Sequence, residues 1–281
     1  MRALVLTTRQ PNQVALVEKL RREVDVVGVV SSANVTGSSA PRNELRRITR
    51  ALAVRTAGRP FLRAWVSLQA HYAERFGEDF PREVTTVDVP NVNAPSTLAA
   101  IESLEPDILL VSGTNMVRAA VVAAMSGRIG VLNLHTGISP YVKGGPNCTN
   151  WCLARGWFHL IGNTVMWLDE GIDSGALIVT ERTPLSGDES LFDLHRKVMD
   201  HAHALYVRAV SALGAGRSLP RVPQDSIGQG RTFYNAEWTV QPMLQARANF
   251  RHHYRAAMAT PRHGDDVRLV SLTNARRRNG F

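Results

Sequence analysis

The chain has 281 residues, 44% of them hydrophobic, which is enough for one α/β domain with additions around a real core. No apolar run approaches the roughly 20 residues that span a bilayer, and Arg9 interrupts the short apolar start, so we expect a cytoplasmic protein with no membrane partner. A formal charge of +9 favours either anionic partners or a solvated arginine-rich surface, and two cysteines argue against a disulfide scaffold.

The first thirty residues predict a βαβ unit. Ala3–Thr7 and Asp25–Val30 are apolar, β-branched runs typical of buried strands, and Val14–Arg22 between them has helical spacing. Strand, helix and strand at these intervals predict a parallel sheet with right-handed crossovers. The loop after the first strand has no glycine, which excludes a dinucleotide-binding fingerprint.

Residues 36–80 are predicted to form an insertion of two helices after the second strand. Residues 42–57 are rich in arginine, and Pro60 precedes an aromatic-rich helical stretch over 61–76. Basic residues interleaved with aromatics can bind single-stranded nucleic acid. Alternatively, the aromatics pack against the body and the arginines face water. We favour packing, and leave oligomer contacts such as a homodimer open.

The middle of the chain continues the alternation of strands and helices. We expect strands over Val84–Val89, Asp107–Ser112 and Val131–Leu134, and helices over 92–104, from about 118 to 126, and over 147–155. Cys148 and Cys152 share one face of the last of these helices. Buried packing is favoured there over a metal site, because no matching pair of Cys or His completes four ligands.

Polar side chains gather where the strand at Val131–Leu134 ends. Asn133 and His135 are two residues apart, so on a strand they project to the same side. Ligands of parallel α/β sheets bind at this carboxyl edge. A second turn, Glu170–Gly175, carries Asp173 between glycines. An amide, an imidazole and a carboxylate can supply an oxyanion donor, a proton carrier and a group that orients the carrier.

The last third is predicted to be mixed. Residues 163–168 and 176–180 predict an antiparallel strand pair around the Asp173 turn, and 189–213 predicts a long helix. After a linker to residue 223, we expect an extended segment at 228–235, a helix over 238–258, and a loosely ordered arginine-rich end.

These motifs, in this order, resemble the signature of folate-dependent formyltransferases. The resemblance rests on Asn133-x-His135, Ser139-Pro140, Gly144-Gly145 and Asp173-x-Gly175, and covers about Val84 to Gly216. It implies an α/β fold with a Rossmann-like, mostly parallel sheet. We therefore expect a catalytic domain over 1–216, with the helical insertion at about 36–80, and a small C-terminal extension over 217–281.

The resemblance implies an N-formyltransferase that moves a formyl group from the co-substrate 10-formyltetrahydrofolate to a primary amine, with no metal. It assigns catalysis to Asn133, His135 and Asp173. It assigns folate binding to Gly113, Asn115, Met116, Val117, Leu168, Gly171 and Ile172, and acceptor binding to Arg9, Gln10, Asn12, Ser139, Tyr141 and Lys143. Asn133 and His135 would stabilise the oxyanion, and His135 or a water held by Asp173 would carry the proton.

The acceptor is expected to be a small amine. Residues after 220 show no row of alternating strands that could build the tRNA-gripping barrel of methionyl-tRNA formyltransferases, so tRNA is disfavoured. A nucleotide-linked amino sugar comes first, because the positive charge suits its diphosphate, and an amino-acid-derived amine such as hydroxyornithine comes second. Glycinamide ribonucleotide and a formate-releasing hydrolysis are less favoured. The alternative of another class is a non-catalytic, basic nucleic-acid-binding protein on this scaffold, supported by the arginine-rich insertion and tail.

Overall fold

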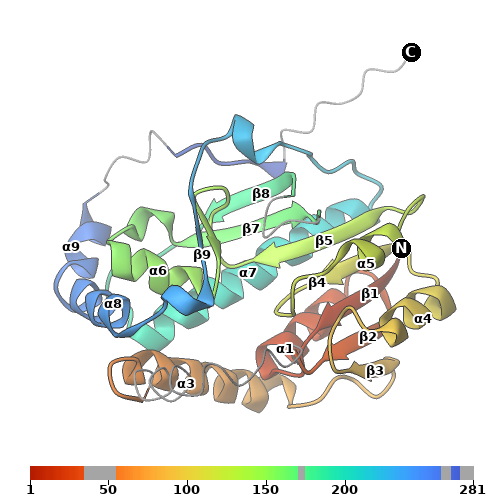
Figure 1. Ribbon diagram of the computed structural model, residues 1–281, viewed down its shortest axis with the longest axis horizontal. Helices are drawn as coiled ribbons and strands as arrows, with labels where there is room; N and C mark the ends of the chain where they lie inside the picture. The colour runs from red at the N-terminus through yellow and green to blue at the C-terminus, as the bar shows by residue number, and fades with distance from the viewer. Residues whose placement is uncertain (35–54, 170–174, 261–266, 273–281) are drawn as a thin grey trace.

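A seven-stranded sheet forms the centre of the molecule. The computed structural model describes residues 1–34, 55–169, 175–260 and 267–272. The strand order is β3-β2-β1-β4-β5-β7-β8 (Figure 1). The first five strands in this order pair in parallel, and β7 and β8 add an antiparallel edge, as predicted. The strands are β1 (Arg2–Thr7), β2 (Asp25–Ser32), β3 (Thr86–Val89), β4 (Ile108–Val111), β5 (Gly130–His135), β7 (Gly162–Trp167) and β8 (Leu177–Arg182).

The strands are apolar along their length because helices cover both faces of the sheet. In β1, Ala3 and Val5 belong to the core shared with α1 (Pro11–Leu20) and α7 (Leu191–Gly214). Leu4 and Leu6, which alternate with them, belong to the core shared with α4 (Pro95–Leu104) and α5 (Ala119–Ala123). All four side chains are inaccessible to solvent. Near-continuous hydrophobic runs are what a parallel sheet between two helical layers requires.

The helical insertion is described only in part. Its second helix is confirmed as α3 (Arg59–Phe76), which packs against α1 and α7. Phe61 and Tyr72 of this helix are buried, so these aromatics pack against the body. Most of the first predicted helix, 42–57, lies outside the described residues.

The helix expected to reach about residue 126 is shorter than predicted. α5 ends at Ala123, and Gly127 follows in a left-handed conformation with φ 77°. The chain is back at the sheet by Ile129, whose N–H donates to Asp107 O at 3.0 Å. The short return path to β5 therefore limits the length of the helix.

A small second sheet joins two parts of the chain that are far apart in sequence. β6 (Val142–Gly144) pairs in parallel with β9 (Arg231–Phe233). Of the Gly144-Gly145 pair noted in the sequence, Gly144 is the last residue of β6 and Gly145 follows it. Gly144 has φ 87°, and a Cβ there would overlap Phe233 O, so glycine permits this close approach.

The C-terminal segment packs beside the sheet on α6 (Cys148–Arg155). α8 (Val240–His252) contacts α6, and α9 (Tyr254–Ala259) follows it. The rings of Trp151 on α6 and Phe233 on β9 stack with centroids 4.3 Å apart. Cys148 and Cys152 are both buried, as expected. Short 3-10 helices lie at Phe158–Leu160, Gln224–Ser226 and Asn235–Glu237.

The longest helix in the described ranges is α7, with 24 residues. Ser190 caps its start by accepting the Asp193 N–H. Tyr206 Oη donates to Leu132 O at 2.8 Å, which ties α7 to β5. Neither α7 nor another helix in these ranges combines the length and the apolarity that a bilayer crossing needs.

Candidate active site

A cavity of about 700 Å³ lies at the carboxyl ends of β1, β4 and β5. Its walls come mainly from the turns that follow these strands, from residues 144–147, and from three parts of the chain outside the central sheet. These are Trp65 on α3, Met199 on α7 and the segment 233–235 at the end of β9. We refer to it as the amide-lined cavity, for the reason given below.

His135, the last residue of β5, lines this cavity and is 8% exposed. Its Nε2 lies 3.2 Å from Val142 O and 3.5 Å from Cys148 Sγ. A backbone carbonyl can only accept, so Nε2 carries the hydrogen. Nδ1 is then the nitrogen that takes up or releases the second proton. Asn133, two residues earlier on the same strand, lines the same cavity.

Two residues that the sequence did not single out shape the loop after His135. Thr164 Oγ1, from β7, donates to Gly137 O at 2.6 Å and accepts the Ser139 N–H at 3.0 Å. A Cβ at Gly137 would lie 2.5 Å from His135 Nε2 and 2.7 Å from Val142 O. The imidazole and the Val142 carbonyl therefore meet only because this position is glycine. The role of Thr164 could not be recognised from the sequence, because it lies within an ordinary strand pattern.

The turn after β4 forms a second wall. Gly113, Asn115, Met116 and Val117, which we predicted to bind folate, all line the cavity. Asn34 Oδ1 accepts the Asn115 N–H at 2.9 Å. Asn34 itself adopts a left-handed φ of 55°, a conformation that asparagine tolerates better than most residues. Its position just before the inserted helices gave no hint of this role.

Amides dominate the chemistry of the described lining. They come from eight residues: Gln10, Asn12, Gln13, Asn34, Asn115, Asn133, Asn147 and Asn235. The described lining contains no lysine, arginine, aspartate or glutamate. The lining also includes the apolar side chains of Val111, Met116, Val117, Leu134 and Leu168. Such a lining suits an uncharged part of a ligand that combines hydrogen-bonding groups with an apolar body.

The residues predicted to bind the acceptor fall into two groups. Gln10 and Asn12 line the cavity. Arg9 does not, because its guanidinium bonds to Asp88 at 2.7 Å and to Asp79 at 2.8 Å. Hydrogen bonds to Asp88 and Asp79 also raise the pKa of Arg9. Arg9 therefore links the loop after β1 to β3 and to the segment that precedes β3.

The other three predicted acceptor residues also lie outside the lining. Ser139 is fully buried under the loop after β5. The Tyr141 hydroxyl accepts the Arg268 N–H at 2.9 Å, and Lys143 lies within β6. Of the remaining predictions, Leu168 lines the cavity. Gly171, Ile172 and Asp173 lie outside the described residues.

The C-terminal extension contributes Phe233, Tyr234 and Asn235 to the lining. Gly145 N donates to Phe233 O at 3.0 Å, which holds this segment against the loop that precedes α6. The sequence predicted an extended segment at 228–235, but not that it reaches the cavity. Within the described part of the chain, no three His, Cys, Asp or Glu side chains converge as metal ligands do.

Residues 77–210 match the family model described as formyl transferase. This part of the chain is a formyl transferase domain. The domain contains β4, β5 and β7, and with them the Asn133 and His135 side chains. The segment that completes the cavity at residues 233–235 lies outside it.

Curated relatives are similar to the chain around this formyl transferase domain. A methionyl-tRNA formyltransferase of Syntrophus aciditrophicus is 29% identical over 143 residues, 51% of this chain and 45% of that protein. One of Delftia acidovorans is 30% identical over 135 residues, 48% of this chain and 40% of that protein. The chain thus spans less than half the length of these relatives.

Solved structures share the fold over a longer stretch. Glycinamide ribonucleotide transformylase 1 from Symbiobacterium toebii has a TM-score of 0.51 at 19% identity, over 79% of this chain and 94% of that one. A sugar N-formyltransferase from Shewanella sp. FDAARGOS_354 has a TM-score of 0.52 at 13% identity, over 88% of this chain and 87% of that one. At these low sequence identities, the likeness shows a shared fold alone.

Proposed function

We propose that the chain is an N-formyltransferase that moves a formyl group from 10-formyltetrahydrofolate to the primary amine of a small acceptor. The observation that carries the proposal is that Asn133 and His135 share one cavity at the carboxyl edge of the sheet, inside a formyl transferase domain. Asp173, the third member of the proposed catalytic set, lies outside the described residues.

The lining fits a folate. A pteridine is flat and has hydrogen-bonding groups along its edge, which suits a lining that combines apolar side chains, amides and a backbone turn. The turn requires glycine at position 113, since Gly113 has φ 65° and a Cβ there would lie 2.7 Å from Gln13 Nε2. The residues proposed to hold the folate are Gly113, Asn115, Met116, Val117 and Leu168, with Gly171 and Ile172 beyond the described residues.

The bound folate would supply the formyl group, and the chain would supply charge stabilisation and proton transfer. The Asn133 amide is a hydrogen-bond donor for the carbonyl oxygen as that oxygen gains negative charge, and one such donor is typically worth about 10²–10³ in rate. His135 would take up, at Nδ1, the proton that the attacking amine loses, because its Nε2 is held by Val142 O. It would return this proton to the folate nitrogen as the bond between that nitrogen and the formyl carbon breaks. Asp173 would orient the imidazole or a water.

We further propose that the acceptor is an amino sugar, with a nucleotide-linked one as the first candidate. Each amide side chain offers a donor and an acceptor, which suits the hydroxyl groups of a sugar. Gln10 and Asn12 on one side, and Asn235 on the other, are the proposed contacts. Sugar N-formyltransferases are among the proteins that share this fold. Residues 1–216 would form the catalytic unit, and 217–281 would complete its acceptor side.

A panel of amines tests both parts of the proposal. The purified chain is supplied with 10-formyltetrahydrofolate and, in turn, a nucleotide-linked amino sugar, the free amino sugar, hydroxyornithine, glycinamide ribonucleotide and methionyl-tRNA. We expect loss of the formyl donor and a formylated product with the amino sugars. Turnover of methionyl-tRNA alone would reject the acceptor and keep formyl transfer. No donor consumption with any amine would reject formyl transfer itself.

A further inference from the structure

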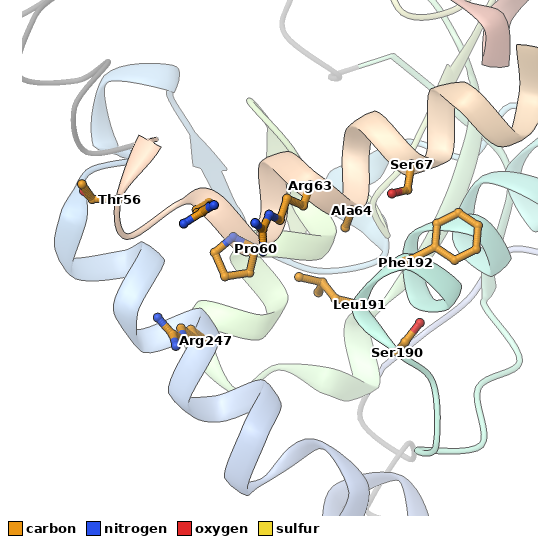
Figure 2. Close-up of a pocket in the computed structure, with 10 residues that line it drawn as sticks. Thr56, Pro60, Arg63, Ala64, Ser67, Ser190, Leu191, Phe192 and Arg247 are labelled. Atoms are coloured by element: carbon orange, nitrogen blue, oxygen red, sulfur yellow. The ribbon is translucent and has the colours of Figure 1, made fainter.

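A second cavity, of about 590 Å³, lies between α3, the start of α7 and α8 (Figure 2). It shares no lining residue with the amide-lined cavity. Figure 2 shows Arg63 of α3 and Arg247 of α8 beside the same space, next to Leu191 and Phe192 of α7. With Arg59, the described part of the lining holds three arginines and no aspartate or glutamate. We refer to it as the arginine-lined cavity.

No aspartate or glutamate of the described residues pairs with the three arginines of this cavity. Arg59 and Arg63 are one turn apart on α3, so they project from the same face. Arg247 comes from α8, on the other side of the cavity. No ion pair within the described residues includes any of the three. Like charges gathered in this way repel one another, and an anion placed between them would remove the repulsion.

The acidic groups near the start of α7 are already bound to other partners. The Glu189 carboxylate accepts from Lys197 Nζ at 2.6 Å and from Tyr254 Oη at 2.7 Å. Burial opposes its ionisation, but these hydrogen bonds, with one from Ser186 N, hold the pKa of Glu189 well below its usual range. Asp188 pairs with Arg255 at 2.8 Å, and Asp193 pairs with Arg196 at 3.5 Å and accepts from Ser190 Oγ at 2.6 Å. These carboxylates are therefore not the counter-ions of the cavity's arginines.

The rest of the lining is suited to an organic anion. Pro60, Ala64, Leu191 and Phe192 form an apolar wall. Ser67 adds a hydroxyl group, whereas the Ser190 hydroxyl already donates to Asp193 Oδ2 at 2.6 Å. The wall also includes the amino end of α7, where backbone N–H groups and the helix dipole favour negative charge. A volume of about 590 Å³ falls within the range of small-molecule sites.

We propose that the arginine-lined cavity binds an organic phosphate with the charge and size of a nucleoside diphosphate. Arg59, Arg63 and Arg247 would hold the phosphates, since guanidinium groups bind phosphate oxygens in pairs. The apolar wall beside Phe192 would hold the uncharged part of the ligand. This site is separate from the one proposed for formyl transfer, and it does not depend on that proposal.

The experiment titrates the full chain with ADP, UDP, pyrophosphate and adenosine by calorimetry, with no folate or amine present. We expect saturable binding of the diphosphates, weaker binding of pyrophosphate, and the weakest binding of adenosine. Arg63→Ala and Arg247→Ala should each weaken ADP and UDP binding at least about tenfold, the loss expected for one charged contact to phosphate.

Matched controls use exposed arginines on the same two helices, outside the cavity. Arg75→Ala on α3 and Arg251→Ala on α8 should bind the diphosphates like the parent chain. Unchanged thermal melting would show that each variant folds. No saturation with ADP or UDP in low salt, or equal weakening by the control variants, would overturn the proposal. Pyrophosphate binding as tightly as ADP would overturn the role of the apolar wall.

Discussion

The two cavities both use α3, but their chemistry differs. Trp65 lines the amide-lined cavity, whereas Arg63, two residues earlier and so on another face of the helix, lines the arginine-lined cavity. The first has eight amides and no lysine or arginine in its described lining. The second has three arginines and no carboxylate among the described residues that line it. One helix therefore separates a neutral, hydrogen-bonding site from a cationic one.

The difference shows what a net charge does not reveal. A charge of +9 suggested that an anionic acceptor would meet cations at the site of reaction. The described lining of the amide-lined cavity offers none, and the clustered guanidinium groups lie elsewhere. The amides would thus contact the hydroxyl groups of the acceptor, whereas the guanidinium groups would bind a separate phosphate ligand, and variants in one cavity should leave the other intact.

The largest effect that separates the cavities should come from His135→Ala. Removal of the proton carrier should lower kcat for formyl transfer by roughly 10²–10⁴-fold. ADP binding by calorimetry should stay unchanged, since His135 does not line the arginine-lined cavity. His252→Ala, at an exposed histidine of α8, is the control and should retain full activity. Full turnover by the His135 variant would reject its catalytic role.

Gly137→Ala should have the next largest effect. The added Cβ would lie 2.5 Å from His135 Nε2, so the imidazole or the Val142 strand must move. A displacement of about 1 Å can cost roughly 10²-fold in rate, and we expect a loss of that order in kcat. Gly214→Ala, at the end of α7, serves as the control. Equal activity of both variants would show that the approach to His135 is not required.

Asn34→Gly should act on binding more than on turnover. Glycine keeps the left-handed backbone but removes the acceptor that holds the Asn115 N–H at 2.9 Å. Loss of one such hydrogen bond typically costs about 0.5–1.5 kcal/mol, so binding of a folate analogue should weaken up to about tenfold. Fluorescence titration measures this, and ADP binding is the internal reference. A change in kcat alone would contradict the assignment.

Salt should give the smallest effect and sharpen the contrast. Raising sodium chloride from about 0.05 M to about 0.5 M shortens the range of electrostatic attraction, so ADP binding should weaken roughly fivefold. The KM of a free amino sugar should change less than about twofold, because no cation lines the described part of its cavity. Equal salt dependence of the two constants would show that both sites bind their ligands through charge.

The central sheet could be predicted because its signals are local. β1, β2, β4 and β5 are short apolar runs with both faces buried, and each appears in the sequence as such. Asn133 and His135 could be paired because two residues on one strand share a side. Gly137 and Thr164 could not be recognised, since their role depends on a contact between β7 and the loop after β5.

Contacts between distant segments were not predictable. β6 and β9 have three residues each, too few for a periodic signal, and nothing local indicates that they pair. Arg63 and Arg247 meet only because α8 returns beside α3 after the sheet is complete. The arginine-rich composition was evident from the sequence, whereas the place where three of these residues gather was not.

The pairing of β6 with β9 has a consequence for how such proteins diversify. Residues 233–235 form one wall of the amide-lined cavity, and they lie outside the segment 77–210 that matches the family model. Grafting a different terminal segment onto the same sheet would remodel that wall while the amide and the imidazole of β5 stay in place. Chimeras that exchange residues 217–281 between relatives should therefore change which amine is formylated, while the residues of β5 remain the same.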